Sequence, residues 1–477
     1  MDELKTDVLY FGDNLEILRK YIPDNSIDLI YLDPPFSSKK DYNIIFKEAT
    51  GERSEAQIKV FSDTWTWDKI AERTYYDIVQ TAPPDVAMLI DALHNVLGNN
   101  DVMAYLVMMT PRLVEMHRVL KDTGSLYLHC DPTASHYLKL VLDQIFGPTN
   151  FRNEIIWHYR TGGVGKRWFG RKHDTIFFYA KSSNYCFNPQ KEKSYLEHKY
   201  GFSNIRIEQD ERGYYTDAFM RDVWSIPGLR GNQPEVLGYQ TQKPLILLER
   251  IIKASSNEGD VVLDPFCGCG TALVAAQKLN RRWLGIDITH LAIRVMSKRL
   301  KDSFSGIEFE VVGVPKDVTS ARALSLQKPD GRYQFQWWAL SLIDAQPLGE
   351  KKKGADKGID GVITFPDERP TRAKRAVVQV KSGHVHVKDI RELKDIASRN
   401  AMGIFITLEP PTREMRTEAV GAGYYHSPLW ERDYPKIQIL TIEELLAGKT
   451  VDIPLPNPPF PKAQKIPQKE GEQLSMG

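Results

Sequence analysis

The sequence predicts an α/β protein: a doubly wound sheet of parallel type, followed by a second, smaller α/β domain. Three observations support this fold class. Short apolar strands alternate with amphipathic helices over residues 8–145, which is typical of parallel sheets. A further strand, helix and strand unit follows at residues 259–287. After residue 309 the composition changes and the alternation resumes, which marks a second domain.

The alternation begins near the N-terminus. Residues 8–11 and 27–32 are apolar strands, and the leucines and isoleucine between them have the spacing of a helix. Residues 105–120 form a strong amphipathic helix, followed by a strand at 125–129 and a helix through residues 137–145. These elements predict strands that lie side by side in one sheet, with helices packed against it.

Composition limits the class of protein. The chain has 477 residues, 42% of them hydrophobic, which is enough for two or three domains with real cores. We find no apolar run long enough to span a bilayer, and the acidic start at residues 1–5 has no export signal. Four scattered cysteines do not make a disulfide framework. We therefore expect a cytoplasmic protein without a membrane partner. The net charge of +1 does not exclude nucleic acid, which needs only a local basic face.

Residues 31–36, Tyr-Leu-Asp-Pro-Pro-Phe, fix an acid at the end of a strand, because two consecutive prolines stop the ladder and stiffen the backbone. The exocyclic amine of a nucleobase is a poor nucleophile until acceptors take its two N–H hydrogens. Asp33 and the carbonyl of Pro34 can supply these acceptors, and Phe36 offers a flat face on which an extruded base can stack. An ordinary strand-end turn with a core phenylalanine is the alternative.

Two stretches depart from the alternation. Residues 37–100 form a polar insertion with Trp65 and Trp67, which is either a lid or DNA-facing loop or a surface excursion with packed aromatics. Residues 151–200 hold ten Lys and Arg against four acids, a net charge of +6, with aromatics around a glycine-rich turn at 162–165. This mixture of cations and stacking faces favours nucleic acid, and a solvated basic loop is the alternative.

A glycine turn after a buried strand is the second chemical signal. The strand at 261–263 ends in Asp264, and Pro-Phe-Cys-Gly-Cys-Gly then allows a tight turn before a helix at 271–279. Free N–H groups at such a helix start suit a nucleotide-like ligand. The next strand ends in Asp287, placed to accept hydrogen bonds from two ribose hydroxyls. Just upstream, Thr-Gln-Lys-Pro at 241–244 opens another helix.

Together these motifs resemble the DNA amino-methyltransferases that use S-adenosylmethionine. Their order, with the catalytic motif first, a recognition region next and the cofactor motif last, is that of the permuted beta group, and the resemblance covers residues 6–302. It implies a seven-stranded doubly wound sheet and double-stranded DNA as the partner, with the target base flipped out. An Asp before the prolines is more similar to adenine-N6 enzymes than to cytosine-N4 enzymes, where Ser is commoner.

The resemblance also implies roles for single residues. Asp33, Pro34, Pro35 and Phe36 would engage the flipped base; the family often has Tyr at the fourth position, and Phe keeps the stacking face without the hydroxyl. A second set would hold the cofactor: Asp264, Phe266, Gly268, Gly270 and Asp287, with Thr241, Gln242 and Lys243 lining its pocket. Residues 160–232 would contribute to target recognition.

The second domain carries another set of polar residues, beyond a polar bridge at 316–322. Asp360 follows a glycine-rich turn at the start of a strand, and the next long strand places Gln379 and Lys381 on one face of the pleat. These three side chains can converge on one metal-bound water, with Asp360 and the carbonyl of Val380 as hard oxygen ligands for Mg²⁺ and Lys381 polarising the nucleophile.

The motifs Gly-Ile-Asp-Gly and Gln-Val-Lys-Ser-Gly are similar to those of the Mrr-like branch of the PD-(D/E)xK nucleases. This resemblance implies a metal-dependent DNA endonuclease with Asp360, Gln379 and Lys381 in its active site and Mg²⁺ at the first two. Gln379 stands where most of the wider superfamily has Glu, which removes a charged ligand, although the Mrr-like branch itself commonly has Gln. The alternative is an inactive domain kept for DNA binding.

We thus expect a DNA methyltransferase domain at 1–310 with target recognition at 155–235, a linker at 311–330, a nuclease-like domain at 331–447 and a disordered Pro-rich tail at 448–477. The expected function is methylation of adenine N6 in a restriction-modification context. The alternatives are a cytosine-N4 enzyme, an orphan methyltransferase whose C-terminal domain only binds DNA, an RNA methyltransferase and a non-catalytic DNA-binding module. The oligomeric state stays open and includes a homodimer.

Overall fold

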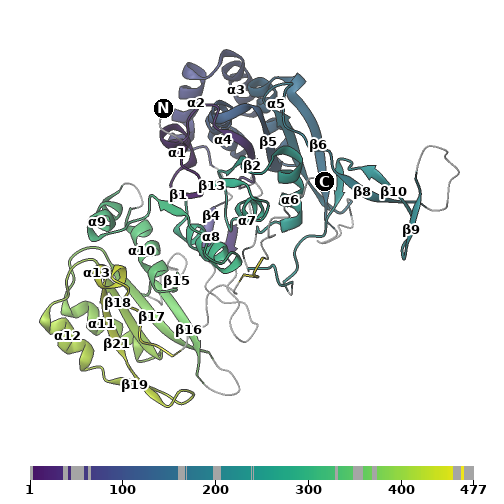
Figure 1. Cartoon of the computed structure of the whole chain (residues 1–477). Coiled ribbons are helices and arrows are strands. Elements are labelled where there is room, and N and C mark those ends of the chain that lie inside the picture. Colours follow the sequence, from purple (N-terminus) through teal and green to yellow (C-terminus); the bar gives the residue numbers. More distant parts are fainter. Residues whose placement is uncertain are drawn as a thin grey trace.

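The chain folds into a larger N-terminal body and a smaller C-terminal body, as the computed structural model in Figure 1 shows. The structure describes residues 4–35, 41–44, 58–62, 66–159, 167, 169–196, 206–231, 233–237, 239, 241–327, 331–347, 358–367, 373–454 and 463–466, with backbone alone at 41–44, 58–62, 366 and 373. Phe36, Trp65 and the glycine-rich turn at 162–165, which the sequence singled out, lie outside these residues.

A nine-stranded sheet in the order β11-β6-β7-β5-β2-β12-β13-β1-β14 forms the centre of the larger body. Among the described strands of this sheet only β7 runs against its neighbours. The strands are β1 (Val8–Phe11), β2 (Ile27–Leu32), β5 (Leu120–Cys130), β6 (Phe151–His158), β7 (His173–Ala180), β11 (Val223–Ser225), β12 (Val261–Asp264), β13 (Arg282–Asp287) and β14 (Glu310–Val312). The doubly wound α/β class is confirmed. The sheet has nine strands instead of seven, because the short edge strands β11 and β14 extend it.

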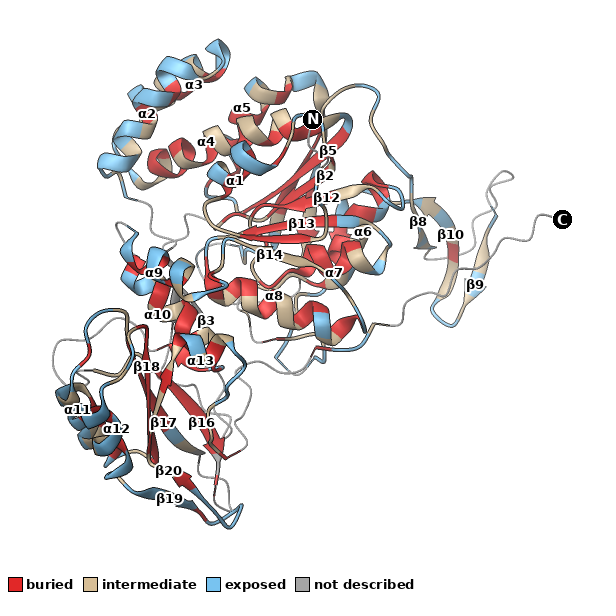
Figure 2. Cartoon of the chain, turned by 60° about the vertical axis from the view of Figure 1, so that its left-hand side comes forward, coloured by how far each residue is buried: buried red, intermediate tan, exposed pale blue. Residues whose placement is uncertain are grey.

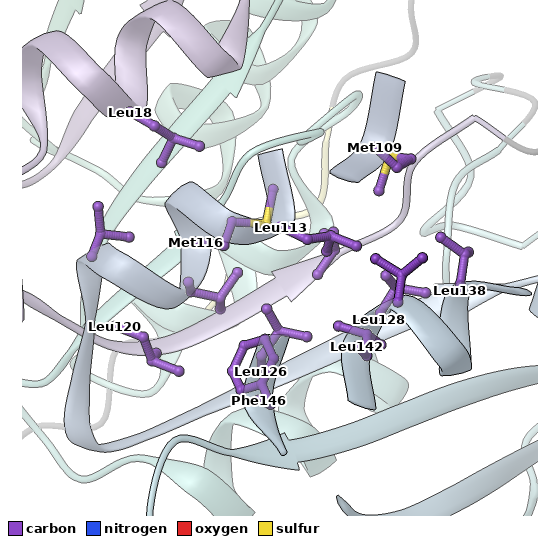
Figure 3. Close-up of a cluster of buried hydrophobic side chains, with 14 of the residues drawn as sticks. Leu18, Met109, Leu113, Met116, Leu120, Leu126, Leu128, Leu138, Leu142 and Phe146 are labelled. Carbon is purple, nitrogen blue, oxygen red and sulfur yellow. The ribbon is translucent and has the colours of Figure 1, made fainter. Parts of the chain in front are cut away.

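One face of this sheet is covered by α1 (Asn14–Tyr21), α4 (Asp101–Val119) and α5 (Ser135–Phe146). Their apolar side chains meet those of β2 and β5 in the cluster of Figure 3, where Leu113 and Leu138 are fully buried. Each such side chain contributes about 1.5–3 kcal/mol by leaving water. The periodicity that predicted these helices therefore corresponds to the face that the sheet buries.

The other face is covered by α6 (Leu245–Ser255), α7 (Thr271–Lys278) and α8 (His290–Ser303). Trp283 of β13 is fully buried there, and its indole N–H donates to Oε1 of Gln277 at 2.8 Å. Figure 2 shows the sheet as a buried layer between the two sets of helices. Helices on both faces are what make the sheet doubly wound.

Within the insertion at 37–100 the structure describes two helices, α2 (Lys69–Thr81) and α3 (Pro84–Leu97). It also describes a hairpin of two strands, β3 (Asp41–Ile44) and β4 (Ile58–Ser62). Trp67 stacks on the ring of His94 with centroids 5.0 Å apart. At Trp67 the insertion is therefore a surface excursion with packed aromatics.

Part of the stretch expected to recognise the target forms an arm that projects from the larger body (Figure 1), whereas β7 and β11 of the same stretch belong to the large sheet. Its three strands are β8 (Lys191–Leu196), β9 (Glu208–Asp210) and β10 (Gly213–Phe219), paired in the order β8-β10-β9. Lys193 of β8 connects the strands of the arm. Its ammonium group contacts Asp210 of β9 at 2.8 Å and lies 4.1 Å from the ring centre of Tyr215 of β10.

The smaller body is a five-stranded sheet in the order β15-β16-β17-β18-β21, with helices on both faces. Its strands are β15 (Gln346–Pro347), β16 (Gly361–Pro366), β17 (Ala373–Lys381), β18 (Met402–Thr407) and β21 (Ile437–Thr441), beside a ribbon of β19 (Tyr424–Ser427) and β20 (Arg432–Pro435). Its helices are α10 (Gly331–Leu342), α11 (Val387–Ala397), α12 (Arg413–Val420) and α13 (Ile442–Leu446).

The two bodies meet along α8, against which α10 packs. The stretch expected as a linker contains a helix, α9 (Val318–Leu326), which begins at a capping box of Asp317 and Ser320. Arg294 of α8 forms an ion pair with Asp344, which follows α10. Residues 463–466, in the stretch expected as a disordered tail, return to the larger body, where the N–H of Ile466 donates to the carbonyl of Ser303 at 3.0 Å.

Candidate active site

Three acids that the sequence singled out lie at one edge of the large sheet. Asp33 follows β2, Asp264 ends β12 and Asp287 ends β13. These strands are parallel neighbours, so their carboxyl ends lie at the same edge of the sheet, where α/β proteins place their ligands.

Asp33 is held by a partner from far along the chain. Its carboxylate forms an ion pair with the ammonium group of Lys243, and the two side chains are 16% and 12% exposed. Pro34 is buried and Pro35 is half-buried, so the turn after β2 is packed against the body of the protein. The sequence placed Lys243 on the wall of the cofactor pocket, and the structure brings it to Asp33.

The glycine turn between β12 and α7 has the backbone that the sequence predicted. Gly268 and Gly270 have φ of +49° and +74°, in the left-handed region that favours glycine. At Gly270 an added Cβ would lie 2.6 Å from Cγ of Met296, so the turn also packs too closely for a side chain. Phe266 is half-buried, and its N–H donates to Asp264 at 3.1 Å.

Asp287 ties its own strand end to this turn. One carboxylate oxygen accepts the N–H of Gly268, and the other accepts the N–H and the hydroxyl of Thr289, each at 2.9 Å. Burial raises the pKa of Asp287 to about 6, against the opposing effect of these hydrogen bonds. Burial also raises the pKa of Asp264 well above its ordinary value, and the nearby charge of Asp33 adds to the effect.

Thr241, Gln242 and Lys243 line a cavity of about 270 Å³ between this sheet edge and the recognition region. Gln242 stabilises the segment before it, since its side chain accepts the N–H of Leu237 at 2.9 Å and donates to the carbonyl of Glu235 at 2.7 Å. The other lining residues are Trp157, Tyr159, Asp174, Gly228, Leu229, Arg230, Gly231, Val236 and Tyr239.

The sequence reading missed a polar chain behind this cavity. The hydroxyl of Tyr31 lies 3.1 Å from Nδ1 of His129, and Nε2 of the same ring lies 3.2 Å from Oδ2 of Asp174. The hydroxyl of Tyr159 donates to Oδ1 of Asp174 at 3.1 Å. The available signal for Asp174 was weak, because it is one of four acids within the basic stretch at 151–200.

Sequence reasoning also missed that the loop after β1 lies at the site. The N–H of Gly12 donates to the carbonyl of Asp287 at 3.0 Å, and the amide of Asn14 donates to the carbonyl of Pro265 at 2.8 Å. Arg112 holds this loop by contacts to Asp13 at 2.6 Å and to Asn14 at 2.7 Å. The loop at 12–14 therefore borders the glycine turn and the Asp287 strand end.

In the smaller body, Asp360, Gln379 and Lys381 lie at the junction of β16 and β17. Gly361 pairs with Val378, which sets Asp360 across from Gln379, and Oδ2 of Asp360 accepts the N–H of Val380 at 2.7 Å.

The side chains of Gln379 and Lys381 differ in their surroundings. Gln379 is 2% exposed, and its Oε1 has no hydrogen-bond partner among the described residues. The ammonium group of Lys381 lies 3.4 Å from Asp389. The described residues contain no group of three His, Cys, Asp or Glu that could hold a metal.

A doubly wound sheet with a glycine turn, an acid at the next strand end and a second acid followed by two prolines defines an α/β protein with a nucleotide-type site beside a polar pocket. The model of the DNA methylase family (N6_N4_Mtase) matches residues 27–298. The chain belongs to this family. A second model, described as NACHT-associated inactive Restriction Endonuclease 1, matches residues 334–447.

Known proteins resemble the N-terminal part of the chain. Type II methyltransferase M.HpaI of Haemophilus parainfluenzae is 30% identical over 295 residues, which are 61% of this chain and 73% of that protein. DNA adenine methyltransferase YhdJ of Escherichia coli is 29% identical over 304 residues, 63% of this chain and 83% of that protein. The solved structure of PvuII DNA methyltransferase (cytosine-N4-specific) has a TM-score of 0.39 at 16% identity over 64% of this chain and 91% of that one.

None of the helices that the structure describes is both long and apolar enough to cross a membrane.

Proposed function

We propose that this protein is a site-specific DNA methyltransferase that moves a methyl group from S-adenosylmethionine to N6 of a flipped adenine in double-stranded DNA. The observation that carries the proposal is the juxtaposition of two strand ends: Asp33 and Pro34 follow β2, and the glycine turn follows its neighbour β12. Adenine is favoured by the acid before the two prolines and by similarity to a relative that is named as an adenine methyltransferase.

The residues at the glycine turn fit a nucleoside-type cofactor. Left-handed glycines bring the backbone close to a ligand at the start of α7, and Asp287 offers a carboxylate beside them. Asp264, Phe266, Gly268, Gly270 and Asp287 would hold the cofactor, and Thr241, Gln242 and Lys243, which line the 270 Å³ cavity, would contribute to its pocket. When bound, S-adenosylmethionine supplies an electrophilic methyl group.

At the base, the residues of this chain act as hydrogen-bond acceptors. Asp33 and the Pro34 carbonyl accept the two hydrogens of the exocyclic amine and draw its nitrogen toward tetrahedral geometry, so that its lone pair becomes available. Asp33 then accepts the proton that the nitrogen releases. Phe36, outside the described residues, would stack on the ring, and Pro35 would keep the turn rigid.

The recognition arm has side chains that suit DNA. Phe219 is 63% exposed at the end of β10, and the ammonium group of Lys191 lies 5.6 Å from its ring centre. Cations beside exposed rings bind phosphates and stack on bases. This part of the chain would read the target sequence.

A cytoplasmic location fits a protein that acts on DNA. Light scattering distinguishes a monomer from a homodimer.

The experiment that tests the function is sequencing of modified bases in DNA from cells that express the protein, beside cells that express Asp33→Ala. The expected result is N6-methyladenine at one sequence motif with the wild-type protein and none with the variant. N4-methylcytosine at the motif would support the cytosine enzyme instead. Unmodified DNA together with methylated RNA would support an RNA methyltransferase. Unmodified DNA and RNA in cells that contain the folded protein would contradict the proposal.

Metal-dependent DNA cleavage by the smaller body is a second candidate function. The observation that favours it is the unpartnered oxygen of buried Gln379 across from Asp360, with Lys381 on the same strand. Two hard oxygens fit Mg²⁺, which Asp360 and Gln379 would hold while Lys381 orients the attacking water. The description of the matching family as inactive favours the other reading, in which the domain only binds DNA. The Mrr-like assignment stays a prediction.

This candidate is tested by titrating Mn²⁺ into the whole protein, with calorimetry for binding and a panel of methylated and unmethylated DNAs for cutting. Binding that Asp360→Ala removes, together with cleavage that needs the metal, would support a nuclease. Absence of cleavage at every metal concentration would leave the domain as a DNA-binding module or a tether. Because the neutral Gln379 replaces a carboxylate ligand, activity is expected only at millimolar metal.

A further inference from the structure

A second carboxylate borders the same cavity as Lys243. Asp174, the second residue of β7, lines the 270 Å³ cavity together with Lys243 and Tyr159. Lys243 forms an ion pair with Asp33, and its charge also helps to lower the pKa of Asp174. The ammonium group of Lys243 is therefore within the influence of two carboxylates, one of which is the proposed acceptor of the target amine.

The polar contacts of Asp174 with His129 and Tyr159 fix the position and charge of its carboxylate. Tyr31 is fully buried, which raises the pKa of its phenol well above the ordinary value, so the phenol keeps its proton; its hydroxyl lies 3.1 Å from Nδ1 of His129. The other ring nitrogen, Nε2, lies 3.2 Å from Oδ2 of Asp174. Burial alone would raise the pKa of Asp174, but His129, Lys243 and Tyr159 together hold it below its ordinary value. Asp174 is thus a fixed anion.

The ion pair with Lys243 hinders Asp33 from accepting the hydrogens of the target amine. In the proposed reaction the amine nitrogen gains positive charge while its hydrogens lie on the Asp33 carboxylate. An ammonium group on the same carboxylate repels this charge and competes for the same oxygens. The reaction is therefore faster if Lys243 moves away from Asp33 when the base arrives.

We propose that Asp174 receives the ammonium group of Lys243 when the target amine reaches Asp33. Asp174 is then a positioning residue: it acts through Lys243 and leaves Asp33 to the base. The flexible four-carbon stem of lysine permits the move, and both groups border one cavity. This inference rests on the proposed methyltransferase function.

A double-mutant cycle tests the transfer of Lys243. Single-turnover methylation is measured at saturating cofactor and DNA, on a duplex with the target site mapped by sequencing, for wild type, Asp174→Asn, Lys243→Met and the double variant. We expect Asp174→Asn to slow methylation by about 10- to 100-fold in the wild-type background and by less than about 3-fold in the Lys243→Met background. If Asp174 only supports His129 and the fold, its loss will slow both backgrounds equally, and the proposal fails.

A second measurement does not depend on the folding of Asp174→Asn. With 2-aminopurine at the position next to the target adenine, which keeps its own N6 amine, Lys243→Met should raise the fluorescence of the bound duplex by about 2-fold or more, because the adenine amine no longer competes with the ammonium group for Asp33 and the adenine leaves the stack more often. Unchanged or lower fluorescence would contradict the proposal.

The matched control is Asp143→Asn. Asp143 also binds a tyrosine hydroxyl and a lysine, with Tyr179 at 2.7 Å and Lys139 at 2.8 Å, but it lies on α5 away from the cavity. We expect this variant to methylate at the wild-type rate. A wild-type protein that methylates no DNA would refute the proposed function, whereas active wild type with equal losses in the cycle would refute the transfer of Lys243 alone.

Discussion

Replacing Asp287 by alanine should weaken the binding of S-adenosylmethionine by about one strong hydrogen bond. The carboxylate accepts hydrogen bonds from the N–H of Gly268 and from the N–H and hydroxyl of Thr289. A ribose hydroxyl would add a further hydrogen bond to this charged acceptor. A hydrogen bond to a charged acceptor contributes about 1.5–3 kcal/mol, so Kd should rise by about 10- to 150-fold.

The pH dependence of cofactor binding is a second, independent test of the role of Asp287. Burial raises the pKa of Asp287 to about 6 in the free protein. Above that pH the group is an ionised acceptor, and below it the group is protonated and loses acceptor capacity. Affinity for the cofactor should therefore fall as the pH falls through about 6, by about 10-fold at one unit below it. Asp287→Asn, which has no carboxyl to titrate, should bind weakly with no such dependence.

Calorimetry at pH 8 and pH 5 measures both effects. Asp317→Ala is the matched control, because Asp317 also accepts a backbone N–H, from Ser320 at 2.7 Å, but does so at the start of α9. It should bind the cofactor as the wild type does at both pH values. Unchanged affinity in folded Asp287→Ala would remove this residue from the cofactor site, and an unchanged pH dependence in Asp287→Asn would assign the titration to another group.

Three further predictions follow from the same geometry. Asp33→Ala should abolish methyl transfer in single-turnover assays and leave DNA and cofactor affinity largely intact, and a rate near that of the wild type would end its catalytic assignment. Gly270→Ala should lower the free energy of unfolding by about 1–3 kcal/mol in urea titration, since its φ is +74° and an added Cβ would lie 2.6 Å from Met296; equal stability would show that the turn can relax. If the smaller body cuts DNA, Lys381→Ala should stop cutting without changing methylation, and cutting that persists would exclude Lys381 from the chemistry.

Local patterns predicted those parts of the site that depend on local backbone. The double proline after β2 and the glycines after β12 restrict the chain within a few residues of themselves, so their positions at strand ends could be read directly. Strand periodicity also predicted the fold class. The number of strands could not be read in the same way, because β11 and β14 are only three residues each and their pairing depends on distant partners.

The polar network of the pocket depends on contacts that no local pattern contains. Lys243 meets Asp33 across 210 positions of the sequence, and Asp174 meets His129 across 45. In the sequence Asp174 is one acid in a basic stretch, and its role follows only from the pairing of β7 with β5, which brings the two side chains together. Sequence reasoning therefore found the groups on single strand ends and missed the groups that tertiary pairing assembles.

Helix α8, which follows the strand end at Asp287, is also where the two bodies meet. At its first turn, Thr289 caps the helix and hydrogen bonds to Asp287. One turn later Arg294 pairs with Asp344 of the smaller body, and burial lowers the pKa of Arg294 to about 10. At the end of the helix, residues 463–466 return from the smaller body to the last turn. Both chain connections of the smaller body thus rest on one helix, whose first turn holds the acid proposed for the cofactor. A displacement of α8 would therefore act on both bodies at once.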